Sequence, residues 1–275
     1  MLHPRSIGAI ALLAALCVSF AEARAWDDAM YPNLKGQWRP IGGPGRFSRG
    51  EQAPLIPEYQ KIFEANLVDQ ASGGQGTTPT YKCLSPGMPR VVNGYGEIEW
   101  IITPETTYFL VEHILDNRRI FTDGRDWPAE LEPTLLGYSI GKWIDTTGNG
   151  RYDLLEVETR GFRGPRAFDA SGIPLHADNQ TVVKERIYLD KADVNVLHDE
   201  VTVFDHALTR PWTAMKNYQR DPKNTRPNWT DEYCESNNHV TLGNNDYMLS
   251  ADGYLMPNKK DQPAPDLRYF KQPGK

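Results

Sequence analysis

The sequence predicts an all-β protein, in which an antiparallel meander of about 8–10 strands closes into a barrel. Short segments that alternate apolar and polar residues follow one another from residue 97 onwards, and Gly, Pro, Asn or Asp separates them. Only one segment of the 275 residues has a convincing helical pattern. Closure into a barrel removes the exposed strand edges that an open sheet would have. A β-sandwich is the alternative that the same pattern allows.

The first segment, residues 1–25, has the three parts of an export signal. A short basic start precedes an apolar run at residues 7–20, and Ala23-Arg24-Ala25 fits a cleavage site. The sequence therefore predicts a periplasmic or secreted protein that is released by cleavage near Ala25.

Residues 26–80 are predicted to form an arm rich in Pro and Gly, with one amphipathic helix at 57–69. Gly36 and Trp38 in this arm form a G-x-W motif, which is typical of the first strand of lipocalin-like barrels. The plainer interpretation is a Trp that packs beneath the arm. We expect the barrel domain at residues 81–250 and an irregular C-terminal wrap at residues 251–275.

Charge and cysteine content limit the partners and the compartment. The formal net charge of −6 at pH 7 argues against a nucleic-acid partner. No segment after the export signal is apolar enough for a membrane span. Cys83 and Cys234 remain after cleavage, and an oxidising compartment favours a disulfide between them over a redox-active thiol pair. The oligomeric state is left open, with a homodimer as one option.

The stretch RRIFTDGRDWP is predicted to be the centre of the functional site. Side chains alternate along a strand, so Arg119, Phe121 and Asp123 share one face. If Phe121 points into the core, both charges point inward with it, where each needs a partner or a function. Arg125 and Trp127 follow directly and would add a second cation and an aromatic wall.

Other strands offer further polar groups for the interior. Glu185 is the lone charge on an apolar strand face, which makes it a candidate interior carboxylate. His113 shares a face with apolar residues, although the opposite face of its strand is equally apolar, and Asp205 ends a strand that mixes acids with aliphatic residues. These groups form either a structural ion-pair network or a ligand pocket, whose aromatic walls would be Trp100, Trp127 and Trp143.

The loop that follows residue 144 allows two interpretations. Asp145, Asn149, Asp153 and Glu156 have the spacing of an EF-hand calcium loop, but the flanking segments are predicted strands and not helices. The favoured interpretation is a Gly-Asn-Gly hairpin turn with surface acids. A structural Ca²⁺ site is the alternative.

A long loop at residues 161–178 carries His176, the histidine that best suits acid/base chemistry because imidazole titrates near neutral pH. The alternative is a loop histidine that is hydrogen-bonded to a carboxylate. The sequence contains no H-E-x-x-H motif, no G-x-S-x-G motif and no Gly-rich phosphate loop. We therefore expect neither a catalytic metal nor an organic cofactor.

Six short motifs of the sequence stand out together: PGMPR (86–90), RRIFTDGR (118–125), GYSIGKW (137–143), VETRGF (157–162), TRPW (209–212) and CESN (234–237). In this combination they resemble a family of exported proteobacterial proteins of largely unassigned function. The resemblance spans residues 80–270 and implies a secreted protein of lipocalin-like β architecture, without a defined reaction or established catalytic residues. It also suggests an association with the cofactor-free breakdown of lignin-derived aromatic dimers.

The favoured hypothesis is a periplasmic, cofactor-independent lyase or isomerase, of retro-aldol type for example, that acts on a small aromatic or phenolic compound. Its base would be Asp123, Glu185, His176 or His113, and Arg119 and Arg125 would stabilise the developing phenolate or enolate. A non-catalytic carrier of a small amphipathic ligand would use the same arginines to bind an acid group. The third hypothesis is a structural, envelope-associated module with an ion-paired core.

Overall fold

The structure is a computed structural model, which describes residues 26–42, 52–74, 76, 80, 84–94, 96–112, 117–222, 239–242, 244–249 and 254–265. The predicted export signal, His113, Cys83 and Cys234 lie outside these residues.

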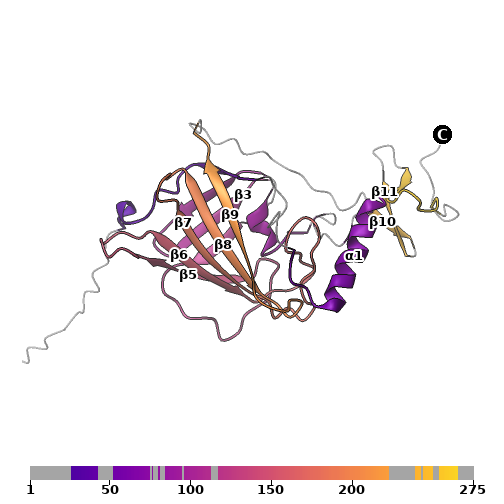
Figure 1. The fold of residues 1–275 in the computed structure, drawn as a ribbon, viewed down its shortest axis with the longest axis horizontal. Coiled ribbons are helices and arrows are strands. Elements are labelled where there is room, and N and C mark those ends of the chain that lie inside the picture. The colour runs from indigo at the N-terminus through magenta and orange to yellow at the C-terminus, as the bar shows by residue number, and fades with distance from the viewer. Residues whose placement is uncertain are drawn as a thin grey trace, which may run out of the picture.

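Nine strands form a closed barrel in which they follow one another around the wall in sequence order (Figure 1). β1 pairs with both β2 and β9, and this double pairing closes the barrel. The all-β barrel predicted from the sequence is therefore confirmed. The strands are β1 (Gln37–Pro40), β2 (Ile98–Ile102), β3 (Thr106–Val111), β4 (Asn117–Phe121), β5 (Tyr138–Ile144), β6 (Leu154–Arg160), β7 (Val182–Leu189), β8 (Val196–Phe204) and β9 (Trp212–Arg220).

One neighbouring pair departs from the expected meander, because β4 and β5 run parallel. Their register places Ile120 opposite Ser139 and Phe121 opposite Ile140. A parallel pair needs a connection that carries the chain back to the starting end of the first strand, and residues 122–137 provide it here. The prediction of an antiparallel meander is thus wrong at this seam, where a long loop separates the strands in place of a tight turn.

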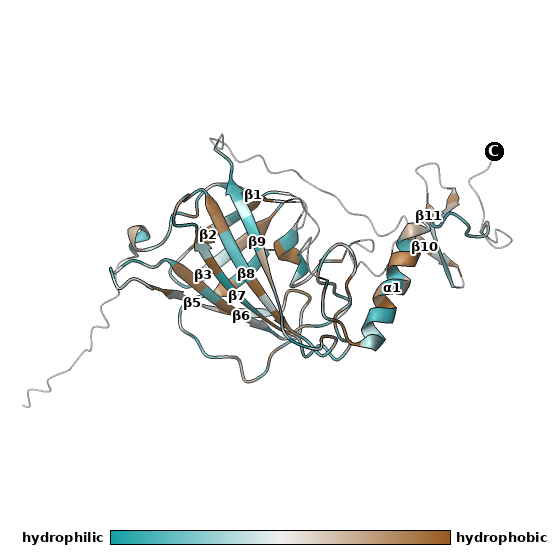
Figure 2. Ribbon diagram, in the orientation of Figure 1, coloured by the Kyte–Doolittle hydropathy of each residue, from teal (hydrophilic) through white to brown (hydrophobic). Residues whose placement is uncertain are grey.

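The barrel interior is filled by alternate side chains of each strand, as the burial pattern along β8 illustrates. Figure 2 shows that the barrel strands contain both hydrophobic and hydrophilic residues. Trp38 of the G-x-W motif is fully buried and donates its Nε1–H to the Leu34 carbonyl at 2.9 Å. Trp38 therefore closes the core as the motif predicts, and the strand that carries it is part of the barrel wall. Trp100 and Trp143 also point into the core, where Trp143 donates its Nε1–H to Thr107 at 3.2 Å.

The helix α1 (Pro57–Ala71) matches the predicted helix closely and lies at one end of the barrel (Figure 1). Pro57 suits the first helical turn because its missing N–H is not needed there. Tyr59 and Phe63 are its buried aromatic residues, and Asn66 donates a hydrogen bond to the Ser171 carbonyl at 2.8 Å. α1 is thereby attached to the long loop between β6 and β7.

The remaining elements lie before and after the barrel strands. A 3₁₀ turn, η1 (Asp28–Met30), precedes β1, and a second, η3 (Arg90–Asn93), precedes β2. A small antiparallel sheet lies near the C-terminal end of α1, where Lys260 N–H binds the Ser72 carbonyl (Figure 1). The C-terminal segment that was expected to be irregular contributes one strand to this sheet. Its strands are β10 (His239–Leu242), β11 (Asn245–Leu249) and β12 (Leu255–Pro257).

Within the described part of the chain, no helix combines the length and the apolar character that a membrane-spanning helix requires.

The strand pairings bring several loops to one end of the barrel. β5 begins next to the end of β6, β7 begins next to the same residues of β6, and β9 begins next to the end of β8. The loop of residues 161–181 and the turn of residues 205–211 therefore share this end, which we call the loop end. Because β4 runs parallel to β5, the start of the β4–β5 seam also lies here.

Candidate functional site

A buried ion pair lies inside the barrel, and Arg118 and Glu185 form it. Arg118 Nη1 donates to Glu185 Oε1 at 2.7 Å, and Arg118 Nη2 binds Glu185 Oε2. Arg118 also donates to Ser139 Oγ at 3.2 Å and to Thr159 Oγ1 at 2.9 Å. Only 1% of the Arg118 side chain and none of the Glu185 side chain is exposed. A bidentate pair with two further hydrogen bonds meets the requirement that buried charges be fully partnered.

The prediction that Glu185 is an interior carboxylate is thus confirmed, but the prediction that Arg119 and Asp123 point inward is wrong. Arg118 and Ile120 point into the core, whereas Arg119 and Asp123 are exposed and Phe121 is only partly buried. Either phase of β4 places one arginine and one large apolar residue inward, so alternation alone does not decide between them. β4 turns inward the face whose arginine reaches Glu185, since an unpaired carboxylate in the interior would cost folding free energy.

A second carboxylate, Asp199, lies in the interior next to this pair. It is fully buried on β8, with Ile187 and Lys216 as its neighbours on the adjacent strands. Neither oxygen of Asp199 has a hydrogen-bond partner among the described residues. Burial, and then the charge of Glu185, raise the pKa of Asp199 well above its ordinary value, while burial lowers the pKa of Lys216 to about 8. The barrel interior therefore favours the protonated form of Asp199 more than water does.

An open pocket of about 460 Å³ lies along the β4–β5 seam, and we call it the seam pocket. Its volume is within the usual range for small-molecule sites. Arg118 and Ser139 reach it from the barrel interior, and the exposed Arg119 and Arg163 border it. Its described lining contains no carboxylate, which makes the pocket electropositive. The described lining is Ser85, Asn117, Arg118, Arg119, Phe121, Thr134, Leu135, Leu136, Gly137, Tyr138, Ser139 and Arg163.

Aromatic rings and arginines continue from the seam pocket over the outer barrel wall. Phe121 and Tyr138 line the pocket and lie with their ring centroids 4.9 Å apart. The Arg125 guanidinium lies 3.9 Å from the centroid of Phe121, and Trp127 lies 6.0 Å from Tyr138. This surface was predicted from the residues of RRIFTDGRDWP, although as part of the barrel interior. The structure brings Arg119, Arg125 and Trp127 together on the outside.

Asp123 is poorly suited to act as a base in this place. Arg125 binds both of its oxygens, at 2.6 Å through Nη2 and at 2.9 and 3.0 Å through Nε. This hydrogen bonding lowers the pKa of Asp123, which favours a permanently ionised partner of Arg125 over a group that accepts protons near neutral pH.

Two other pockets offer weaker cases for ligand binding. One, of about 430 Å³, lies on the outer faces of β5 to β8, where Lys184 pairs with Glu158 at 3.2 Å and Arg186 with Glu156 at 3.6 Å. The other, of about 620 Å³, lies next to η1 and is bordered by acids and bases of both signs, including Asp27, Lys35 and Arg151. Neither combines unpaired charges of one sign with an aromatic wall.

The candidate calcium loop uses its acids within the turn. The Asp145 carboxylate accepts backbone N–H groups of Gly148 and Gly150, both at 2.7 Å, and Asp153 binds Thr146. These contacts outweigh desolvation and lower the pKa of Asp145. Asn149 accepts the N–H of Arg151, and Glu156 points outward from β6 toward Arg186. This arrangement supports the hairpin interpretation.

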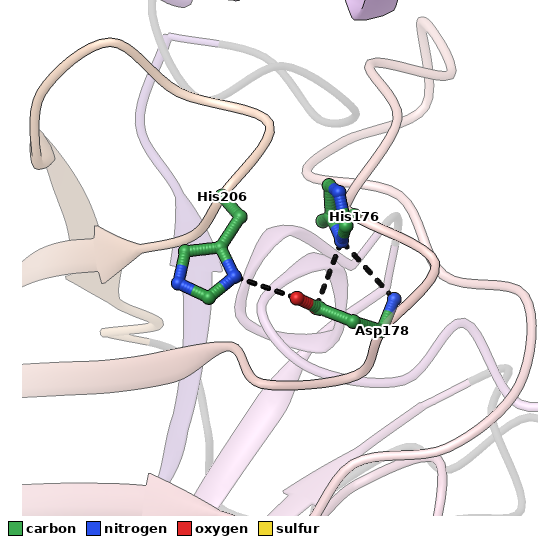
Figure 3. Close-up of side chains that lie close together, drawn as sticks. All are labelled: His176, Asp178 and His206. Carbon is green, nitrogen blue, oxygen red and sulfur yellow. Dashed lines mark hydrogen bonds and ion pairs between the residues drawn. The ribbon is translucent and has the colours of Figure 1, made fainter.

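His176 lies away from the seam pocket, in a group with Asp178 and His206 at the loop end (Figure 3). Desolvation would raise the pKa of Asp178, but hydrogen bonds from the Gln180 N–H, His206 and His176 outweigh it and lower the pKa to about 2. Asp178 in turn raises the pKa of His206. The interpretation of His176 as a loop histidine beside a carboxylate therefore matches the structure. Asp205 lies nearby and binds the backbone N–H of His176 at 2.9 Å.

Sequence reasoning missed several of the residues that these sites contain. Arg118 and Ser139 were missed because their faces were assigned wrongly or not at all. Arg163 lies on the long loop at residues 161–178, and no local pattern connects it to β4. His206 and Asp178 had a weak signal, since each lies within two residues of another acid or histidine, but the fold alone brings them together.

In comparisons with known proteins, no family model and no curated sequence matches the chain. The resemblance to exported proteobacterial proteins stays a prediction.

The buried pair gives a direct stability prediction. Arg118→Met leaves the charge of Glu185 buried without a partner, so we expect the free energy of unfolding to fall by about 3–5 kcal/mol. The double variant Arg118→Met/Glu185→Leu removes both charges and should recover most of that loss. Urea denaturation measures both effects.

The matched control for this experiment is Arg119→Met, on the same strand and exposed. Its free energy of unfolding should stay within about 0.5 kcal/mol of the wild type. A loss as large as that of Arg118→Met would mean that the two faces of β4 are reversed.

Asp199 gives a prediction about pH. Because the fold raises the pKa of Asp199, the wild type loses stability as the pH rises above the unfolded-state pKa of about 3.9. The side chain of Asp199→Asn cannot ionise. The free energy of unfolding of this variant, minus that of the wild type, should therefore increase as the pH rises above about 3.9, by up to about 1.4 kcal/mol per pH unit. Urea denaturation across a pH series measures this difference, and a difference independent of pH would contradict it.

Asp190→Asn is a control of opposite sign. His198 and the backbone N–H groups of Asp193 and Ala192 lower the pKa of Asp190 to about 2. The wild type therefore gains stability as the pH rises from about 2 to about 4, and the variant should lose stability relative to it over that range.

Proposed function

We propose that this protein binds a small aromatic or phenolic compound that carries an acid group, and that the seam pocket holds it. The observation that carries the proposal is that the guanidinium groups of Arg119 and Arg163 are unpaired among the described residues. Both guanidinium groups border the pocket, and neither has a hydrogen bond or ion pair among the described residues. Two unpaired cations beside an apolar wall provide the kind of site that selects an amphipathic anion.

The geometry favours a planar ligand of modest size. A carboxylate or phenolate oxygen can accept hydrogen bonds from Arg119 and Arg163, because guanidinium groups present their donors in a plane that suits two acceptor oxygens. Phe121 and Tyr138 then offer ring faces for the aromatic body of the ligand. Arg118 also lines the pocket, but its charge is paired with Glu185 and its other hydrogen bonds go to Ser139 and Thr159.

Ligand binding is tested with vanillate, a phenolic acid, against vanillyl alcohol, which has the same ring without the acid group. Isothermal titration should show binding of vanillate and a much weaker response to the alcohol. Arg119→Met or Arg163→Met removes one charge-assisted contact of about 1.5–3 kcal/mol, which corresponds to a loss in affinity of about 10–100-fold. Equal affinity for the acid and the alcohol would contradict an anion site.

Arg210→Met is the matched control for this titration, because Arg210 is exposed at the loop end and does not line the pocket. Its affinity for vanillate should equal that of the wild type. A loss as large as that of Arg163→Met would indicate general electrostatic attraction and not a pocket.

A cofactor-free lyase or isomerase on the same class of compound is the second candidate. Asp199 supports it, because burial raises the pKa of its carboxyl, and perturbed pKa values of this kind are typical of catalytic acids and bases. Asp199 lies behind the Arg118–Glu185 pair, so substrate would need access beyond that pair. Mass spectrometry of vanillate and of lignin-type phenolic dimers after incubation separates the two candidates: intact ligand supports a carrier, and cleaved ligand an enzyme.

We further propose that the protein is exported and that Cys83 and Cys234 form a disulfide. Two sequence features support this: the export pattern of residues 1–25, and the presence of two cysteines, an even number, in the rest of the sequence. Thiol titration of the denatured, unreduced protein isolated from its exported form should find no free thiol. Two free thiols would contradict the disulfide.

A further inference from the structure

We propose that His176, Asp178 and His206 form a binding site for one divalent transition-metal ion (Figure 3). One ligand atom from each residue can be chosen so that all three lie within 4.8 Å of one another. Throughout the described residues, no other group of three or more His, Cys, Asp or Glu side chains meets this condition. The site shares no residue with the seam pocket, so it is independent of the proposed ligand.

The spacing of the donor atoms suits a single ion. His176 Nδ1 lies 2.9 Å from Asp178 Oδ1, and His206 Nδ1 lies 2.6 Å from Asp178 Oδ2. A tetrahedral ion with bonds of about 2.0–2.1 Å holds its ligand atoms about 3.3 Å apart. Both His–Asp distances therefore need to lengthen by less than about 1 Å to admit the ion. The two imidazole nitrogens, whose ligand atoms lie within 4.8 Å of each other, need to lie at a similar spacing of about 3.3 Å. Asp178 lies between the two rings, so its carboxylate can bind the ion that both imidazoles approach.

Two groups of Asp178 compete for one nitrogen of His176. The backbone N–H of Asp178 lies 3.1 Å from His176 Nδ1, and its carboxylate Oδ1 lies 2.9 Å from the same atom. A nitrogen and a carboxylate oxygen this close to each other can both bind one metal ion.

Asp205 joins the two chain segments that carry the ligands. Its Oδ1 accepts the backbone N–H of His176 and that of Ala207, each at 2.9 Å, and its Oδ2 accepts the Thr181 hydroxyl at 2.6 Å. One carboxylate therefore fixes the backbone beside His176 and beside His206 before any ion binds. Supporting contacts of this kind orient metal ligands in known sites.

Tyr59 of α1 holds the His176 ring itself. The two rings stack with centroids 5.1 Å apart and an angle of 28° between their planes, and the Tyr59 hydroxyl accepts the N–H of Ala177 at 3.0 Å. His176 is only partly exposed, whereas the His206 side chain is 68% exposed. An ion can thus approach from the solvent side of His206 and find His176 already oriented.

The donor set points to the chemistry of the ion. Two imidazoles and one carboxylate suit Zn²⁺ and neighbouring divalent ions better than Ca²⁺ or Mg²⁺, which prefer oxygen ligands. Three protein ligands leave at least one coordination position open, and at this site it faces solvent. A bound ion would also cross-link the loop of residues 161–181 to the turn before β9.

Zinc titration of the untagged full chain tests the site, with isothermal calorimetry as the measurement. We expect one equivalent of Zn²⁺ to bind, and a rise in melting temperature that depends on zinc concentration. His206→Asn and His176→Asn should abolish this binding. Asp205→Asn should weaken it by about 10–100-fold, because it removes a supporting contact and not a ligand.

His198→Asn is the matched control. His198 also pairs with an aspartate, Asp190, at 3.0 Å, but its other ring nitrogen binds Asn217 and no second histidine joins them. This variant should bind zinc like the wild type. Circular dichroism and urea denaturation without metal establish that each variant folds, and the exposed His206 gives the safest substitution.

Two outcomes would overturn the proposal. The first is a wild type that binds no zinc, or binds it without a defined stoichiometry. The second is one equivalent of zinc that binds equally well to His206→Asn, because that ion would be held elsewhere on the chain.

Discussion

The Arg118–Glu185 ion pair is the constraint on which the arrangement of the barrel depends. An interior carboxylate on β7 is tolerated only with a cation and further donors, and Arg118 on β4 supplies them together with Ser139 on β5 and Thr159 on β6. These contacts cross the β4–β5 seam. They set the inward phase of β4, because Arg118 has to face the interior. Arg119 is consequently directed outward, where it borders the seam pocket with Arg163.

The seam also explains why the seam pocket lies in the wall and not inside the barrel. Large side chains such as Trp38, Phe109 and Tyr218 fill the interior, and Tyr218 binds the Val92 carbonyl with its hydroxyl. At the seam, two parallel strands pair over a short register and the chain between them is long, so the wall leaves room for a pocket. Positive charge, aromatic rings and a polar floor meet there. The same loop end carries the His176–Asp178–His206 group, which uses different residues and a different kind of ligand.

Sequence patterns predicted what depends on local periodicity. Alternation identified most of the barrel strands and the inward Glu185, because a lone charge on an apolar face is distinctive, and the amphipathic pattern identified the helix at α1. Alternation could not choose between Arg118 and Arg119, since each has a large apolar neighbour two residues away. The parallel pairing of β4 and β5 has no local signature, and the described residues of the seam pocket come from four separate segments. His176 was identified by its chemistry, but its neighbours Asp178 and His206 become partners only through the fold.

The account rests on Arg118 facing the interior and Arg119 facing the seam pocket, and hydrogen exchange of the arginine side chains measured by NMR tests this most directly. In ¹⁵N-labelled protein, the Arg118 Nε–H should be protected from exchange, since it is buried and donates to Ser139. A protected arginine signal should disappear in Arg118→Lys and persist in Arg119→Lys, while the Arg119 signal exchanges rapidly and shifts on addition of vanillate. A protected Nε–H that is lost in Arg119→Lys and kept in Arg118→Lys would contradict the account.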